Sequence, residues 1–138
     1  MTASTDAFKM LRAFMRKMAA WEKESMKLVD KVEQGKADID DVSATQMKKL
    51  QTIQDEFCVA SKWRRSSFTV ESPAEYDLKS NKITRCEPVA EGKVEVEMRQ
   101  TVGAETLVRI EMLAIAGEWK VSRRWMLFEN KKPLACEL

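Results

Sequence analysis

The spacing of apolar residues changes once along this chain, and that change constrains the fold more than any other feature. Residues 6–62 place apolar side chains every three or four positions, which is typical of amphipathic helices. Residues 66–128 instead alternate apolar and polar side chains, as half-buried strands do. Helices followed by strands predict an α+β domain, in which the N-terminal helices pack on a curved antiparallel sheet and give a cone shape. At 138 residues we expect a single domain, residues 1–138, that ends in a short irregular tail, residues 129–138.

Two helices are predicted in the first part of the chain. The first is expected to start near Asp6 and to stop at Gly35, because glycine commonly follows the end of a helix. The second is expected to begin at the capping box 43–46 and to end near Ser61. The aspartates between residues 38 and 41 lack the glycine and the closing glutamate of a calcium loop, so we interpret them as helix-capping acids.

The pairing of the later strands follows from parity, because a slip of one residue turns every side chain to the other face of the sheet. The predicted strands are 67–71, 83–86 (which ends before Pro88), 94–102, 106–115 and 119–128. A three-residue turn with Gly103 at positive φ sets Met98 opposite Ile110. A two-residue turn, 116–117, then sets Ile110 opposite Arg123.

This register predicts an interior pocket beneath the helices. Arg123 would lie there between Trp119 and Trp125, and an interior charge is costly unless it is paired. Either a carboxylate closes the cone as a structural ion pair, or Arg123 lines a pocket that binds an anionic group. The residues expected to form this pocket are Glu22, Glu75, Tyr76, Asp77, Trp119, Arg123 and Trp125.

The opposite face of the sheet is predicted to be either a solvated surface or a surface that binds a partner or a second copy of the chain. Tryptophan and arginine contribute most of the binding energy at many protein interfaces. The candidate partner-binding residues are those at the end of the second helix and on this face: Trp63, Arg64, Arg65, Arg99, Arg109, Arg124, Met126 and Phe128.

The composition excludes several kinds of function. The chain has no histidine, so histidine bases, histidine metal ligands and histidine-activated nucleophiles are impossible. Its 3 cysteines are widely spaced, which argues against a zinc site or a disulfide framework and suits a reducing cytoplasm. The net charge of +2 gives no basic field for nucleic acid, and we find neither a signal peptide nor a membrane span. We therefore expect no cofactor, no metal, no nucleic-acid partner and no membrane partner.

Several motifs, in this order, resemble a known family: Phe57-Cys58, Trp63-Arg64-Arg65, Pro73-x-Glu75-Tyr76-Asp77 and Gly117-x-Trp119-x-Val121. Together with the helices before them, over about residues 8–128, they resemble the nuclear transport factor 2-like fold. More narrowly, they resemble the bacterial immunity proteins of that fold. The resemblance implies a non-catalytic protein that binds and neutralises a cognate toxin.

The same fold also includes dehydratases and ketosteroid isomerases, whose pockets use His–Asp or Tyr–Asp pairs. This chain has no histidine, and Tyr76 and Asp77 are neighbours on one loop rather than opposite each other. We expect the ring of Tyr76 to anchor its loop in the core, with the hydroxyl hydrogen-bonded. An enzyme or small-molecule-binding protein that uses arginine and carboxylates in the cone remains the alternative.

Overall fold

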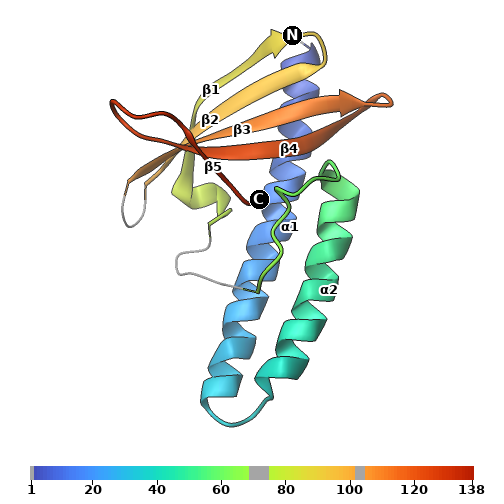
Figure 1. The fold of residues 1–138 in the computed structure, drawn as a ribbon, viewed down its shortest axis with the longest axis vertical. Coiled ribbons are helices and arrows are strands. Elements are labelled where there is room, and N and C mark those ends of the chain that lie inside the picture. The colour runs from blue at the N-terminus through green and yellow to red at the C-terminus, as the bar shows by residue number, and fades with distance from the viewer. Residues whose placement is uncertain (1, 69–74, 102–104) are drawn as a thin grey trace.

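The computed structural model of this protein describes residues 2–68, 75–101 and 105–138, which form two long helices and one sheet (Figure 1). The elements are α1 (Thr2–Glu33), α2 (Ile39–Phe57), the short 3₁₀ helix η1 (Leu78–Ser80), β1 (Asn81–Ala90), β2 (Lys93–Gln100), β3 (Thr106–Ile115), β4 (Glu118–Leu127) and β5 (Leu134–Cys136). The strands form one antiparallel sheet in chain order, β1-β2-β3-β4-β5. This confirms the predicted α+β class and the order of its two parts.

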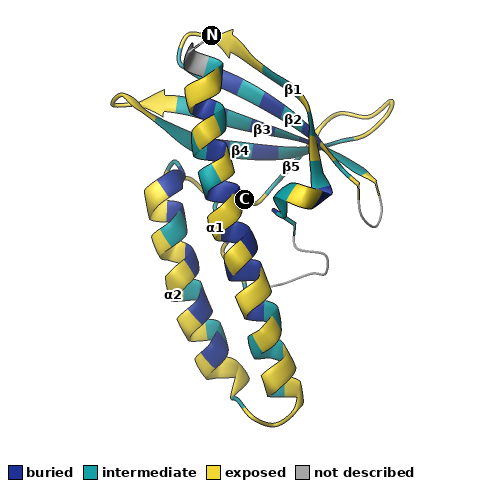
Figure 2. Ribbon diagram, turned by 180° about the vertical axis from the view of Figure 1, so that it is seen from behind, coloured by how far each residue is buried: buried dark blue, intermediate teal, exposed yellow. Residues whose placement is uncertain are grey.

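The helices pack on one face of the sheet, and the core lies between the two layers. Seen from behind, α1 crosses the sheet while the far half of the α1–α2 hairpin extends beyond it (Figure 2). Leu11, Phe14 and Met18 of α1 are fully buried, as are Val96 of β2 and Ile110 of β3. The other face of the sheet, which we call the outer face, carries no helix and is turned toward the viewer in Figure 1.

The first helix stops where the sequence predicted but starts earlier. Gly35 has a φ of +72° just beyond α1, so it is the expected C-terminal stop. Asp6 lies inside α1, so the prediction that it caps the helix is wrong. The helix extends to Thr2 because Ala7 and Leu11 are buried, and this burial stabilises the first turns.

The second helix begins and ends earlier than predicted. Its N-cap is Asp38, whose side chain accepts a hydrogen bond from the backbone N–H of Asp40, so the capping box at 43–46 is wrong. Gln46 is buried against α1, where its Nε2 donates to Ser25 Oγ at 2.9 Å. The helix ends at Phe57 because the next residues run alongside β4, with the N–H of Val59 donating to Val121 O at 2.9 Å.

Both edges of the sheet differ from the prediction. β1 is longer than 83–86 and contains Pro88, which an edge strand tolerates because one side of its backbone has no partner strand. The tail expected to be irregular contains β5, and beyond it Leu138 is fully buried. Ser67 and Phe68 are not in a strand, and the rest of the predicted strand 67–71 lies outside the described residues.

The pairing of β2 with β3 is two residues away from the predicted register. Gln100 pairs with Thr106, so the connection is five residues long and Met98 lies opposite Val108 instead of Ile110. A slip of two residues keeps each side chain on its face, so Val94 and Met98 are buried as expected. Gly103, the residue predicted to have positive φ, lies outside the described residues.

The pairing of β3 with β4 starts as predicted and then shifts. Ile115 pairs with Glu118 across the two-residue turn, in which Ala116 and Gly117 both have positive φ. A β-bulge follows: Val121 pairs with Met112 and Arg123 with Glu111, so Ser122 has no partner across the ladder. The bulge turns the rest of β4 over. The inward residue opposite Ile110 is therefore Arg124, and not Arg123 as the sequence predicted.

Candidate functional site

Two arginines meet one glutamate in the interior, between the helices and β4. Glu75 forms ion pairs with Arg65, at 2.7 Å, and with Arg124. The two arginines are only 8% and 9% exposed. Both were predicted to bind a partner from the surface, and the structure places both inside. Arg124 is interior because of the bulge, and Arg65 because the chain beyond α2 turns back over the core.

Glu22 of α1 holds the loop that carries Glu75. Its carboxylate, 1% exposed, accepts the backbone N–H groups of Glu75 at 2.9 Å and of Tyr76 at 3.1 Å. Burial raises the pKa of Glu22, while these hydrogen bonds and the charge of Arg65 act in the opposite direction. Glu22 was expected to share a pocket with Arg123, and instead it binds backbone amides near Arg65.

Tyr76 lies in the core, as its predicted role required. Its ring centroid is 5.2 Å from that of Phe14, and the guanidinium groups of Arg65 and Arg124 lie 5.9 and 5.8 Å from it. Its hydroxyl is buried without a hydrogen-bond partner among the described residues, contrary to expectation, and burial raises its pKa. Asp77 instead caps η1 by accepting the N–H of Lys79 at 3.2 Å, so the two residues form no acid–base pair.

These contacts occupy the charged groups of the interior. Glu22, Arg65, Glu75 and Arg124 satisfy one another or nearby backbone groups. Burial also raises the pKa of Cys58 to about 12, which keeps this thiol protonated and unreactive. Within the described part of the chain, no group of acidic or sulfur side chains could hold a metal ion.

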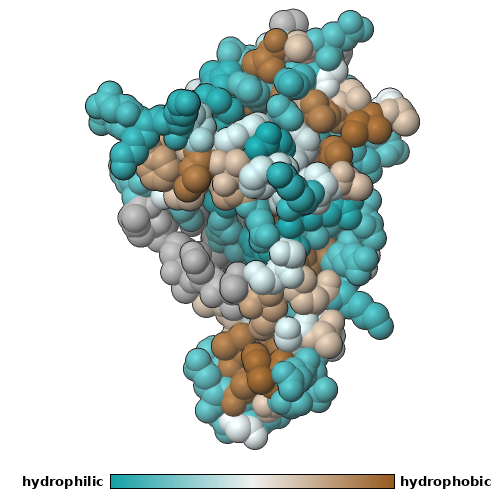
Figure 3. Space-filling model, in the orientation of Figure 1, coloured by the Kyte–Doolittle hydropathy of each residue, from teal (hydrophilic) through white to brown (hydrophobic). Residues whose placement is uncertain are grey.

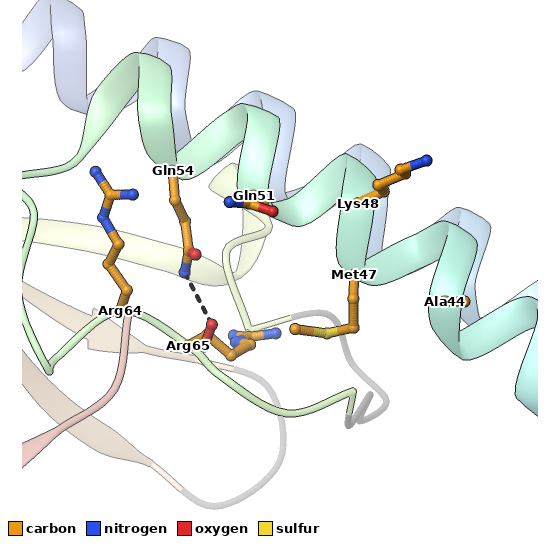
Figure 4. A pocket seen from close by; sticks show the side chains of 7 residues that line it. All are labelled: Ala44, Met47, Lys48, Gln51, Gln54, Arg64 and Arg65. Carbon is orange, nitrogen blue, oxygen red and sulfur yellow. Dashed lines mark hydrogen bonds between the residues drawn. The ribbon is translucent and has the colours of Figure 1, made fainter.

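A groove lies at the surface next to this interior, between α2 and the segment at Arg64 and Arg65 (Figure 4). Its volume is about 440 Å³, and Gln54 Nε2 donates to the carbonyl of Arg65 across it at 3.4 Å. Arg64 pairs with Asp55 at 2.6 Å and donates to two carbonyl oxygens beyond the end of α2. The lining side chains are Ala44, Met47, Lys48, Gln51, Gln54, Arg64 and Arg65, none of which is acidic.

The outer face carries a different cluster, which we call the Trp–Arg–Trp stack: Trp63, Arg123 and Trp125. The guanidinium of Arg123 lies 4.6 Å from the Trp63 ring centroid and 4.7 Å from that of Trp125. Arg123 and Trp125 were predicted to lie inside, and the bulge in β4 places them outside. Trp119 precedes the bulge and packs against the core as predicted.

Other charges on the outer face are largely paired. Arg85 forms ion pairs with Glu87, Glu95 and Glu97, and Arg109 lies 3.9 Å from both Glu95 and Glu97. The space-filling view shows hydrophilic residues between separate hydrophobic areas on this face (Figure 3).

The remaining partner candidates divide between the two faces. Arg99 is exposed and lines a surface hollow with Phe128, which is 44% exposed. Met126 lies opposite the buried Val108, on the helix side, rather than on the outer face where it was expected.

Figure 3 also shows an apolar area over the far end of the helical hairpin, where Ile39 is exposed.

Sequence reasoning missed the stack because no pattern marked the bulge. One signal was available: Arg123 and Arg124 are consecutive, so in any regular strand one of them must face inward. Which of the two faces inward depends on whether Ser122 is an extra residue in the strand. In the structure it is, and its hydroxyl donates a hydrogen bond to Glu111.

Comparison with known proteins identifies a family. The sequence model of NTF2 fold immunity proteins matches residues 6–132. Searches of curated proteins and of solved structures found no match to this chain. Two helices followed by a five-stranded antiparallel sheet agree with an NTF2-like α+β fold. None of the described helices has the length and apolar character needed to cross a membrane.

Proposed function

This chain belongs to the family of NTF2 fold immunity proteins, and from that membership we propose that it neutralises one cognate toxin by binding it, without catalysing a reaction. A toxin-neutralising role in general follows from the family. The mode of action, a stoichiometric protein complex formed at the surface of the fold, is our proposal.

The observation that carries this proposal is the state of the interior. In an enzyme built on such a cone, the polar groups of the interior would be available to a substrate. Here Glu75 is shared by Arg65 and Arg124, and Glu22 is occupied by two backbone N–H groups. The polar interior therefore supports packing, which leaves the surface for recognition. The alternative of a small-molecule site in the cone has no comparable support.

We further propose that the protein acts in the cytoplasm. The three cysteines are free thiols, and Cys58 is buried, which suits a reducing compartment. The homodimer through the outer face also remains a prediction, and light scattering of the purified protein at micromolar concentration would measure it.

The test begins with the toxin itself. The tagged chain is purified from its native host, co-purifying proteins are identified by mass spectrometry, and each is expressed in a sensitive host with and without this chain. We expect one such protein to stop growth alone and to be tolerated when this chain is present. A Leu11→Asp variant, which places a charge in the core, serves as the unfolded control and should not protect.

Titration then separates binding from catalysis. Increasing amounts of this chain are added to a fixed amount of the purified toxin, and residual toxin activity is measured. A binding inhibitor should reduce the activity linearly and abolish it near one equivalent. Complete inactivation at a small fraction of an equivalent would show that the chain modifies the toxin catalytically and would refute the proposal.

A further inference from the structure

We propose that the Trp–Arg–Trp stack is the anchor through which this chain binds an acidic surface of its toxin, with Arg123 pairing to an aspartate or glutamate of that surface. This inference rests on the proposed function, because it names the surface and the chemistry by which the toxin is bound.

The geometry of Arg123 leaves one edge of its guanidinium available. Trp63 and Trp125 flank the group, with their centroids 4.6 and 4.7 Å from its central carbon. Its Nε is buried and has no hydrogen-bond partner among the described residues. The edge formed by Nη1 and Nη2 is thus the part of this half-buried side chain that can meet solvent or a partner, and two parallel N–H groups match a carboxylate.

The neighbouring carboxylate does not neutralise this charge. Glu111 lies directly across the ladder from Arg123, but its Oε1 accepts a hydrogen bond from Ser122 at 2.7 Å and its Oε2 lies 3.5 Å from Lys93 Nζ. No described carboxylate forms an ion pair with Arg123, whereas Arg85 in the same sheet has three such partners.

One further cation lies beside the stack. The ammonium of Lys62 lies 5.3 Å from the ring centroid of Trp63, which adds a second positive charge beside Arg123. A partner that covers this area must bring negative charge, since an arginine buried at an interface without a carboxylate is costly.

The indole rings make the cation a suitable anchor. Trp63 reaches the stack from the segment after α2, and Trp125 from β4, so two separate parts of the fold flank the guanidinium group. A pre-oriented arginine loses little conformational entropy on binding, and tryptophan and arginine dominate interface hot spots.

The same charges argue against a second copy of the chain as the occupant. In a twofold dimer centred on the stack, each Arg123 and Lys62 would face the same residues of the other copy. Like charges would then meet where opposite charges are needed, so we assign the stack to the toxin, and a homodimer through the outer face would have to be centred elsewhere on it.

The experiment measures the affinity of the toxin recovered by co-purification, using titration calorimetry on this chain and three variants. Arg123→Gln should raise Kd at least about 30-fold, and Arg123→Lys, which keeps the charge but not the planar fork, should raise it less. Arg16→Gln is the matched control, because Arg16 is exposed on α1 and this substitution removes the same charge as Arg123→Gln. Its Kd should change less than about twofold. Circular dichroism and thermal unfolding establish that each variant is folded.

A charge exchange identifies the partner group. Arg123→Glu should abolish binding of the unmodified toxin. Replacing one acidic residue of the toxin by lysine should then lower the Kd for Arg123→Glu at least about tenfold relative to the unmodified toxin. Unchanged affinity for Arg123→Gln, with the wild type still neutralising the toxin, would overturn the inference and leave the proposed function intact. Binding of single-stranded RNA is measured alongside. If the wild type binds RNA, and Arg123→Gln loses this binding while toxin binding is unchanged, the stack belongs to a nucleic-acid site and the inference is overturned.

Discussion

Residues 123 and 124 are both arginine, and one peptide unit separates an interior ion pair from a surface cation. Arg124 reaches Glu75 and also donates to the carbonyl of Glu137 at 3.4 Å. The guanidinium of Arg123 lies against the rings of Trp63 and Trp125 and forms no ion pair with a described residue. At the residue scale the environment therefore decides the role of each side chain, and the type of residue does not.

Glu22 gives a prediction about pH. Burial favours its neutral form, so its pKa in the folded state lies above the ordinary 4.5 that applies in the unfolded chain. Between these two values the folded state holds more protons, so the contribution of Glu22 to stability decreases as pH rises. The free energy of unfolding of wild type relative to Glu22→Gln should therefore be higher at pH 4 than at pH 7, as measured by urea unfolding.

Glu24 provides a control of opposite sign on the same helix. Its hydrogen bond with Lys49, at 2.6 Å, lowers the pKa of this exposed carboxylate. Wild type compared with Glu24→Gln should lose stability as pH falls below 4.5. If Glu22→Gln showed this same direction, the buried state described for Glu22 would be wrong.

At the scale of elements, the sequence predicted most of the fold because periodicity and parity survive small errors. The register of β2 and β3 was wrong by two residues, yet every side chain kept its face. The bulge in β4 adds one residue, and one residue exchanges the faces. Arg123 was therefore predicted in the pocket and Arg124 on the partner surface, which is the reverse of their positions in the structure. The pattern of apolar residues cannot distinguish two adjacent arginines.

The start of α2 and the strand β5 could not be predicted from the sequence either. Asp38 and Ser43 are both good helix caps, and the choice between them depends on the short connection after Gly35. β5 has only three residues, too few for alternation to be recognised.

The bulge leads to a prediction about deletions in β4. Removing Ser122 should leave Arg124 facing inward and Arg123 outward, because Ser122 is the residue without a partner in the ladder. The protein should fold and lose about 1–2 kcal/mol of stability, because the hydrogen bond from the Ser122 hydroxyl to Glu111 is removed. Urea unfolding measures the change.

Deletion of Lys120, two residues earlier, is the comparison. It would turn Val121 out of the core, where that side chain is fully buried, and should cost about 3 kcal/mol or more. Equal losses for the two deletions would contradict the described register.

At the scale of the whole molecule, the segment after β5 packs against the segment that follows α2. The N–H of Leu138 donates to the carbonyl of Trp63 at 2.9 Å, and Arg65 Nε donates to the carbonyl of Leu138 at 3.0 Å. The segment after α2 and the segment after β5 thus hold each other over the core, although 73 residues separate Arg65 from Leu138.

Leu138→Ala should therefore destabilise the whole domain by about 2–5 kcal/mol, because the fully buried side chain leaves a cavity. Leu134→Ala is the matched control: Leu134 is 56% exposed and its replacement should cost less than about 1 kcal/mol. Thermal unfolding of both variants measures the difference, and similar losses would show that the segment after β5 does not seal the core.

The extra residue in β4 also has a consequence for how such a protein can evolve. Beyond Ser122, alternate positions of one strand have different environments: Arg124 pairs with Glu75 in the interior, whereas Arg123 and Trp125 lie on the outer face, where we propose that the toxin binds. A lineage can exchange the side chains at 123 and 125 to follow a changing adversary while the ion pair behind them stays in place. On the proposed assignment of the stack to the toxin, recognition and folding would then be nearly independent traits of a single strand.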